Sequence, residues 1–396
     1  MNEQIKIGSI IKQIRGVSYK PTDVREADEK NAVALLRANN IQETGLNFDE
    51  LVYIDRSMVK SEQYLRAGDI LICSSSGSKN LVGKAAYVPE DLPCSFGAFC
   101  KVVRTQAVDS YYLGQYFQSP RYRQEISEAS AGANINNIRN EHIDELTIPA
   151  HSKSEQMEIV QILLCLNKQI DCTKQHLEKL DELVKSRFIE LFGDPVANSF
   201  GWKKALLCEV TSKIGSGATP RGGKESYQAE GITLIRSMNV HDGRFEYKDL
   251  AHITDEQAAQ LDNVTVEDGD VFINITGASV ARSCIVPTDI LPARVNQHVA
   301  IIRCVREWLH PRFANNMFLN DRFKGQLLDI GESGGATRQA ITKQQLENLA
   351  VILPPLELQE QFAAFVEQTD KSKLAIQESL VELETLKKAL MQKYFG

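Results

Sequence analysis

The sequence contains no long uninterrupted run of apolar residues. A membrane-spanning helix needs about 18 of them or more, and no such run occurs among the 396 residues. The N-terminal stretch, residues 1–16, also lacks the apolar core of a secretory signal peptide. We therefore expect a cytoplasmic protein that does not associate with membranes.

Metal-binding patterns are missing as well. The 8 cysteines are scattered along the chain without a Cys-x-x-Cys pair, and the 7 histidines are isolated. Zinc sites need such residues in closely spaced pairs. The sequence thus predicts reduced thiols and no metal site.

Neither a basic excess nor a nucleotide-binding loop is present. Lys and Arg number 45 against 52 Asp and Glu, a net charge of −7, whereas non-specific nucleic-acid binders are usually basic. If the chain binds DNA, folding must gather basic side chains on one face, or a basic partner must contribute. Residues 215–217 and 222–225 come nearest to a phosphate-binding loop, but their spacing is wrong for one. A motor activity is therefore not expected.

What the sequence does contain is an internal repeat with an offset of about 200 residues. The order of the shared segments is kept, which makes coincidence improbable. The paired segments are 35–41 and 234–240, 68–72 and 269–273, 130–133 and 333–336, 148–149 and 353–354, and 155–156 and 360–361. This period is too long for a solenoid and indicates two copies of one domain-plus-helix unit.

Each copy begins with short apolar runs separated by Gly, Ser, Asn and Pro, a pattern typical of a sheet with irregular loops. Predicted strands are residues 70–73, 85–88, 99–103, 271–275 and 299–305. Helical stretches are predicted at residues 111–128 and 312–328. Each copy is therefore a mixed α/β domain.

Each copy ends in a predicted long helix. Residues 154–191 contain neither Pro nor Gly and carry apolar side chains at every seventh position, at Leu163, Ile170, Leu177, Val184 and Leu191. Ser152 and Glu155 form a capping box before it, and Gly193 and Pro195 stop it. Residues 356–394 repeat the pattern. The two apolar stripes are most simply buried against each other.

These patterns together predict an α+β protein with a pseudo-twofold internal repeat. Two mixed α/β domains, residues 1–151 and 196–354, alternate with two long helical segments, residues 152–195 and 355–396. The helices are expected to pack as an antiparallel coiled coil.

This organisation resembles the specificity subunits of type I restriction-modification systems over essentially the whole chain. The local signatures are residues 183–195, which end the first helix, and residues 353–357, which open the second. The resemblance implies two target-recognition domains, each reading half of a split double-stranded DNA target in host defence. It also implies that the helices set the gap between the half-sites and dock two methylation subunits, which two restriction and translocation subunits join in the full complex.

The sequence also lacks the motifs of an enzyme, so the chain is expected to be non-catalytic. An adenine methyltransferase needs a Gly-rich S-adenosylmethionine loop and an Asp/Asn-Pro-Pro-Tyr/Phe motif around the flipped base, and neither occurs. Residues 353–356 contain two prolines but lack the polar and aromatic flanks, and are interpreted as a helix start. The chain is expected to bind no cofactor, while the methylating partner uses S-adenosylmethionine. The alternative is a coiled-coil scaffold that organises protein partners without binding DNA.

Candidate DNA-binding residues are polar or basic side chains beside predicted strands and turns, because such groups read base edges and grip phosphates. The first pair of segments carries Ser74, Ser75, Ser76, Ser78, Lys79 and Asn80, and then Thr276, Ser279 and Arg282. The second pair carries Asn134, Asn136, Asn137 and Arg139, and then Thr337, Arg338 and Gln339. Thr219, Arg221 and Lys224 form a third, one-sided group. A Gly/Ser segment after a strand can equally be an ordinary hairpin turn.

Arg37 and Arg236 recur at equivalent places in both copies. Two domains that read different bases should differ where they touch bases. These arginines are therefore candidates for phosphate contacts or for a shared structural hydrogen bond.

Overall fold

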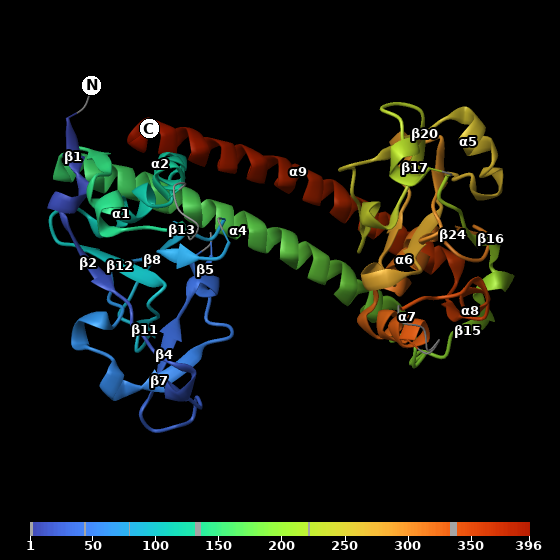
Figure 1. Ribbon diagram of the computed structural model, residues 1–396. Helices are drawn as coiled ribbons and strands as arrows, with labels where there is room; N and C mark the ends of the chain where they lie inside the picture. The colour runs from blue at the N-terminus through green and yellow to red at the C-terminus, as the bar shows by residue number, and fades with distance from the viewer. Residues whose placement is uncertain (1–2, 43–44, 79, 131–135, 221, 333–338) are drawn as a thin grey trace. The chain divides into compact units, whose positions relative to one another are not determined.

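The computed structural model describes residues 3–42, 45–78, 80–130, 136–220, 222–332 and 339–396. The chain divides into two compact units, each of which combines one α/β domain with parts of both long helices (Figure 1). Unit 1 comprises Met1–Lys174 and Glu378–Gly396, and unit 2 comprises Gln175–Gln377.

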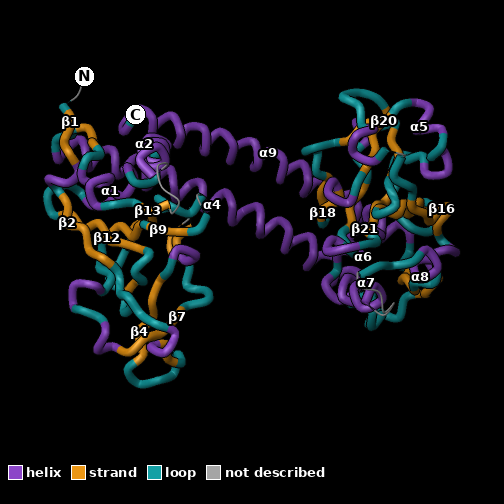
Figure 2. The backbone as a smooth tube through the Cα atoms, viewed as in Figure 1, coloured by secondary structure: helices purple, strands orange, loops and turns teal. Residues whose placement is uncertain are grey.

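Both predicted long helices are present. Helix α4 runs over Lys153–Phe192 and helix α9 over Leu356–Phe395, with 40 residues in each (Figure 2). The capping box is confirmed, since Ser152 N–H donates to the Glu155 carboxylate at 2.7 Å and Glu155 N–H donates to the Ser152 hydroxyl at 3.3 Å. Gly193 follows α4 with a φ of +71°, which glycine adopts without steric cost.

The main sheet of unit 1 has four antiparallel strands in the order β10-β8-β12-β2. Their bounds are Ala85–Tyr87, Ile70–Cys73, Cys100–Thr105 and Ile11–Arg15. A second sheet has the order β11-β4-β7-β3, with bounds Ser95–Phe96, Ala32–Leu36, Val52–Asp55 and Val24–Arg25. In this sheet β11 and β4 are parallel.

Unit 2 repeats this arrangement. Its main sheet has the order β22-β21-β24-β16, with bounds Ser283–Ile285, Val271–Asn274, Val299–Cys304 and Thr211–Ser216. Its second sheet has the order β23-β17-β20, with bounds Ala293–Val295, Ile232–Ile235 and Ala251–Ile253, and β23 and β17 are again parallel. A short antiparallel pair completes each domain, β1 (Gln4–Lys6) with β14 (Thr147–Pro149) and β15 (Lys203–Leu206) with β25 (Ala350–Leu353).

The two predicted helical stretches within the domains are each split in two. Residues 111–128 form α1 (Ser110–Tyr116) and α2 (Pro120–Ser130), and residues 312–328 form α6 (Pro311–Leu319) and α7 (Asp321–Glu332). Pro120 starts α2 because proline fits a first helical turn but cannot continue a preceding helix. Asn320 breaks the second stretch, since its side chain accepts from Arg322 N–H at 3.2 Å and caps α7. Shorter helices are α3 (Asn140–Asp144), α5 (Asp255–Ala259) and α8 (Lys343–Glu347).

A buried aspartate explains why Gly-Asp recurs in the sequence. Asp69 accepts two hydrogen bonds from Arg104 at 2.6 and 2.7 Å, and Asp270 accepts two from Arg303 at 2.8 Å each. Both aspartates are fully buried, so each carboxylate needs this paired arginine to offset its desolvation. The repeat therefore preserves a structural ion pair.

The long helices belong to the core of each unit. In unit 1, Ile159 and Leu163 of α4 and Met391 and Phe395 of α9 lie in one buried cluster with Tyr112 of α1. Unit 2 has the matching set, Phe362 and Val366 of α9, Phe188 and Phe192 of α4, and Phe313 of α6. The ring of Phe313 lies 4.7 Å from that of Phe192 and 5.6 Å from that of Phe188, in the range of favourable aromatic pairs.

The sequence repeat paired residues 155–156 with 360–361, which makes Gln361 the counterpart of Gln156. In the structure the counterpart lies two residues earlier. Buried Gln156 accepts from Asp109 N–H at 3.0 Å and donates to the His151 carbonyl at 2.8 Å. The residue that does the same in unit 2 is Gln359, which accepts from His310 N–H at 2.9 Å and donates to the Pro354 carbonyl at 2.9 Å. Both glutamines tie a long helix to the start of a domain helix.

Candidate nucleic-acid interface

Two separate candidate segments of unit 1 lie side by side. Strand β9 (Ser75–Ser76) pairs antiparallel with β13 (Asn136–Asn137), and Ile138 N–H donates to the Ser74 carbonyl at 2.8 Å. Ser78, Asn80, Asn137 and Arg139 are exposed around this ladder. Lys79, Asn134 and the side chain of Asn136 lie outside the described residues.

The same contact joins the corresponding segments of unit 2. Ile341 N–H donates to the Ile275 carbonyl at 2.8 Å, and Gly277 N–H donates to the Gln339 carbonyl at 3.0 Å. Thr276 and Ala340 form an antiparallel bridge. Ser279 lies in the following turn, and Thr337 and Arg338 lie outside the described residues. Each domain thus brings its two candidate segments into one polar surface.

The third group is connected to this surface in unit 2. The Thr219 hydroxyl donates to Gln297, the Gln297 amide contacts His298 Nε2 at 3.1 Å, and His298 Nδ1 lies 2.5 Å from the Thr276 hydroxyl. Arg221 and the side chain of Lys224 lie outside the described residues. Gln297 and His298 were not among the predicted site residues, because a histidine isolated in the sequence gives no sign of its partners in space.

Arg282 has a basic counterpart in unit 1 that the sequence repeat did not reveal. Arg282 O accepts from Asn274 N–H at 2.9 Å, and Lys84 O accepts from Cys73 N–H at 2.9 Å. The preceding residues, Ala281 and Gly83, both have positive φ. Lys84, rather than Lys79, therefore occupies the position of Arg282. Within the described part of the chain, neither side chain forms an ion pair.

The shared hydrogen bond expected of Arg37 and Arg236 is present. Arg37 donates to the Glu50 carbonyl at 2.8 Å, and Arg236 donates to the Asp249 carbonyl, in each case thirteen residues downstream. Asn40 and Asn239 accept from the backbone N–H of the respective arginine at 2.9 and 3.1 Å. Both arginines therefore hold an equivalent loop in place.

Lys101 and Cys73, two other polar residues of unit 1, are too buried to contact DNA directly. Lys101 on β12 is 7% exposed, and its ammonium group donates to Asn140 at 2.9 Å and Gln13 at 3.2 Å. Burial lowers the pKa of Lys101 to about 8, although Asp144 and Glu141 oppose the shift. Burial also raises the pKa of the Cys73 thiol at the end of β8 to about 11, which leaves it protonated and unreactive.

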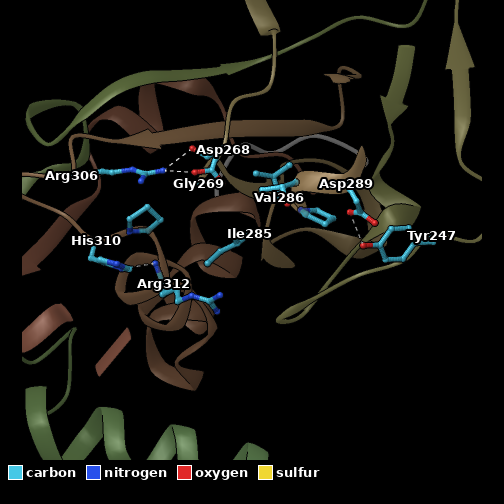
Figure 3. A pocket seen from close by; sticks show the side chains of 12 residues that line it. Tyr247, Asp268, Gly269, Ile285, Val286, Asp289, Arg306, His310 and Arg312 are labelled. Atoms are coloured by element: carbon cyan, nitrogen blue, oxygen red, sulfur yellow. Dashed lines mark hydrogen bonds and ion pairs between the residues drawn. The ribbon is translucent and has the colours of Figure 1, made fainter. Parts of the chain in front are cut away.

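Cavities in unit 2 mostly lie apart from these segments. A cavity of about 460 Å³ is lined by Tyr247, Asp268, Arg306 and His310 among others (Figure 3). Some of its charged groups have partners within the lining, whereas the lining residue Arg312 pairs with Asp370 outside it. Arg306 donates to Asp268 at 2.9 Å and the Tyr247 hydroxyl donates to Asp289 at 3.1 Å. Burial lowers the pKa of His310. Arg282 instead lines a larger groove of about 1560 Å³.

Neither a metal-binding cluster nor a membrane-spanning helix is found among the described residues. No group of three or more His, Cys, Asp or Glu among those residues is placed to hold a metal ion. No described helix combines the length and apolarity needed to cross a membrane.

Comparison with known proteins gives one consistent family. The model of the type I restriction modification DNA specificity domain matches twice, at residues 2–182 and 201–385. The EcoKI specificity subunit of Escherichia coli strain K12 is 25% identical, and the StySPI specificity subunit of Salmonella potsdam is 27% identical. Each alignment covers 98% of this chain and 87% of the relative.

Solved structures agree with this fold. The crystal structure of a type I restriction-modification S subunit from M. genitalium matches with a TM-score of 0.58 at 14% identity, covering 100% of this chain and 96% of that one. Because the family model covers both halves of the sequence, the chain belongs to the type I restriction-modification DNA specificity family and is a specificity subunit with two target-recognition domains.

Proposed function

We propose that each target-recognition domain reads one half of a split double-stranded DNA target through the polar surface described above. The observation that carries this proposal is the duplicated contact between distant polar segments, Ser74 with Ile138 and Ile275 with Ile341. Exposed serine, asparagine, threonine and arginine side chains around it are of the kinds that bind bases and phosphates. Because the chain's net charge is acidic, either basic side chains gathered on one face by folding or a basic partner must supply the attraction for the duplex.

The long helices are proposed to pack as an antiparallel coiled coil related by a pseudo-twofold axis. Within unit 1, Lys174 of α4 pairs with Glu384 of α9 at 3.2 Å, and within unit 2, Lys373 of α9 pairs with Asp181 of α4 at 2.5 Å. The buried clusters support the same direction, since the start of α4 packs with the end of α9 in unit 1 and the start of α9 packs with the end of α4 in unit 2. In this arrangement the helices set the distance between the half-sites.

The remaining partners complete a cytoplasmic complex. Two methylation subunits dock on the specificity subunit, bind S-adenosylmethionine and methylate adenine, and two restriction and translocation subunits join them. The specificity subunit itself contributes no cofactor site and no catalytic residue. The absence of the methyltransferase motifs from the sequence supports this division of labour.

Reconstitution from purified proteins tests the proposal. The chain, its methylation subunit and their mixture are each incubated with duplex DNA and S-adenosylmethionine, and methylated adenines are mapped. We expect methylation of one split target by the mixture alone. Methylation by the isolated chain, or methylation by the mixture without sequence preference, would overturn the proposal and favour a scaffold role.

A further inference from the structure

The turns that precede β12 and β24, each of which leads from one sheet of its domain to the other, share a backbone conformation. In unit 1, Gly97 N–H donates to the Leu36 carbonyl at 2.9 Å, and Gly97 O accepts from Cys100 N–H at 2.8 Å. In unit 2, Asn296 N–H donates to the Ile235 carbonyl at 3.0 Å, and Asn296 O accepts from Val299 N–H at 3.4 Å. Residues 97–99 and 296–298 therefore occupy equivalent positions in the two domains.

Each turn adjoins the polar surface. Phe99 O accepts from the backbone N–H groups of Ser74 and Ser75 at 2.9 and 3.0 Å. His298 O likewise accepts from Ile275 N–H at 2.9 Å. The last residue of each turn thus lies next to the segments proposed to bind DNA.

The side chains on this common backbone differ in chemistry. Phe99 is 69% exposed, and Ala98 precedes it. The corresponding residues in unit 2 are His298 and the exposed Gln297. Domains that read different half-sites must differ where they touch bases and can agree where they touch phosphates. The turns meet the first condition, and the matched pair Lys84 and Arg282 meets the second.

The hydrogen bonds of Gln297 leave its amide with one free donor and one free acceptor, which can bind the edge of a base. A glutamine amide has two acceptor lone pairs and two donor hydrogens. Thr219 occupies one lone pair and His298 Nε2 occupies one hydrogen. One acceptor and one donor remain, which is the complement of adenine N6 and N7 in the major groove.

We propose, on the basis of the function proposed above, that residues 97–99 and 296–298 are the specificity-determining segments of the two domains. Gln297, positioned by Thr219 and His298, selects an adenine in the half-site of unit 2. Phe99 makes an apolar contact with a thymine methyl group in the half-site of unit 1.

The first test replaces Gln297 in the complex assembled with its methylation subunits, acting on a library of randomised duplexes. Gln297→Ala should reduce base discrimination at one position of one half-site by roughly 5- to 150-fold. Gln297→Glu should move the preference at that position toward cytosine, whose amino group donates to a carboxylate. The matched control is Gln260→Ala, an exposed glutamine in the same unit, which should leave every preference unchanged.

The second test applies the same assay to Phe99→Ala, with the exposed Phe48→Ala as its control. Only Phe99→Ala should relax one position, and that position should lie in the other half-site. We also measure the binding of each assembled variant to duplexes that differ at the relaxed position. This binding reports the base preference even if a variant no longer methylates DNA. Equal weakening for all duplexes, or unchanged preference in both variants, would overturn the inference.

These outcomes are separable from failure of the proposed function. A parent complex that methylates a defined target while the Gln297 and Phe99 variants keep its preferences refutes the assignment of the two turns alone. A parent complex without any sequence preference refutes the proposed function and the assignment of the turns together.

Discussion

Where both domains hold a basic side chain at the same backbone position, that side chain is expected to contact a DNA group that is present in both half-sites. Lys84 and Arg282 fulfil this condition, since each follows a positive-φ residue and each carbonyl accepts from the end of an equivalent strand. The phosphate backbone is common to all sequences and carries the salt dependence of binding. We therefore assign these two residues to phosphates rather than bases.

Lys84→Ala and Arg282→Ala should each weaken DNA binding by the assembled complex without altering the bases preferred. The slope of log K against log salt concentration should become shallower by about 0.9 for each phosphate that the variant no longer neutralises. Binding to target and non-target duplexes over a range of salt concentrations measures this. Lys84→Arg and Arg282→Lys, which keep the charge, should retain the parent slope; a variant that changes base preference would contradict the assignment.

Lys101 gives unit 1 a stability that depends on pH. Its folded-state pKa of about 8 lies below the ordinary lysine value of 10.5, so the unfolded chain holds the proton more tightly. Below pH 8 the charged ammonium destabilises the folded state, and this penalty disappears as the pH rises toward 10.5. The full difference corresponds to about 3 kcal/mol.

The stability of the parent relative to Lys101→Met should therefore increase between pH 8 and 10. Methionine does not titrate, and comparison at equal pH cancels the contributions of all other groups. Hydrogen exchange of the β12 amides in both proteins is the measurement, since it reports on unit 1 specifically. A stability difference that stays constant over this range would show that Lys101 is not held in the environment described.

At the scale of elements, the sequence predicted what local periodicity determines. The helices α4 and α9 were predictable because a seven-residue apolar repeat runs without Pro or Gly. Strand β8 was predicted to the residue, from a short apolar run bounded by Gly and Ser. Phe99, by contrast, was predicted to begin a strand, whereas it ends the turn before β12 and is exposed, because an apolar side chain in a short run does not reveal which face it occupies.

Contacts between distant segments could not be predicted in the same way. The pairing of Ser75–Ser76 with Asn136–Asn137 depends on the whole domain, and the chain of Thr219, Gln297, His298 and Thr276 spans separate segments. The repeat showed that segments of the two halves correspond, but it paired individual residues wrongly where only a short motif supported the alignment. Gln359 illustrates this, because the motif comparison selected Gln361 instead.

Gln359→Ala should destabilise unit 2 by about 1–3 kcal/mol, because the buried Gln359 side chain is the hydrogen-bond partner of backbone groups at His310, Trp308 and Pro354. Gln361→Ala is the matched control, and this exposed residue should cost less than about 0.5 kcal/mol. Both tryptophans, Trp202 and Trp308, lie in unit 2, so their fluorescence during urea unfolding reports on this unit. Equal effects of the two substitutions would contradict the assignment of Gln359 as the counterpart of Gln156.

For the whole molecule, the proposed coiled coil makes a prediction about the gap between the half-sites. An insertion after Phe192 would lengthen α4 at an unsuitable place, because Phe192 is fully buried and its carbonyl accepts from the Trp202 indole at 2.9 Å. The boundary between the units, after Lys174 in α4 and after Gln377 in α9, avoids both domain cores. Seven residues inserted at each place add two helical turns and keep the apolar stripe in register.

The paired insertion should lengthen the helices by about 10 Å, which corresponds to about three base pairs at 3.4 Å each. Mapping of methylated adenines with the assembled complex should therefore show a gap that is about three base pairs longer. The bases within each half-site should be unchanged, because neither the polar surfaces nor the turns at residues 97–99 and 296–298 are altered. An insertion in α4 alone serves as the control, since it mismatches the two helices and should abolish or strongly reduce methylation. Activity of the paired variant on the original spacing, or a change in the half-site bases, would show that the helices do not set the gap.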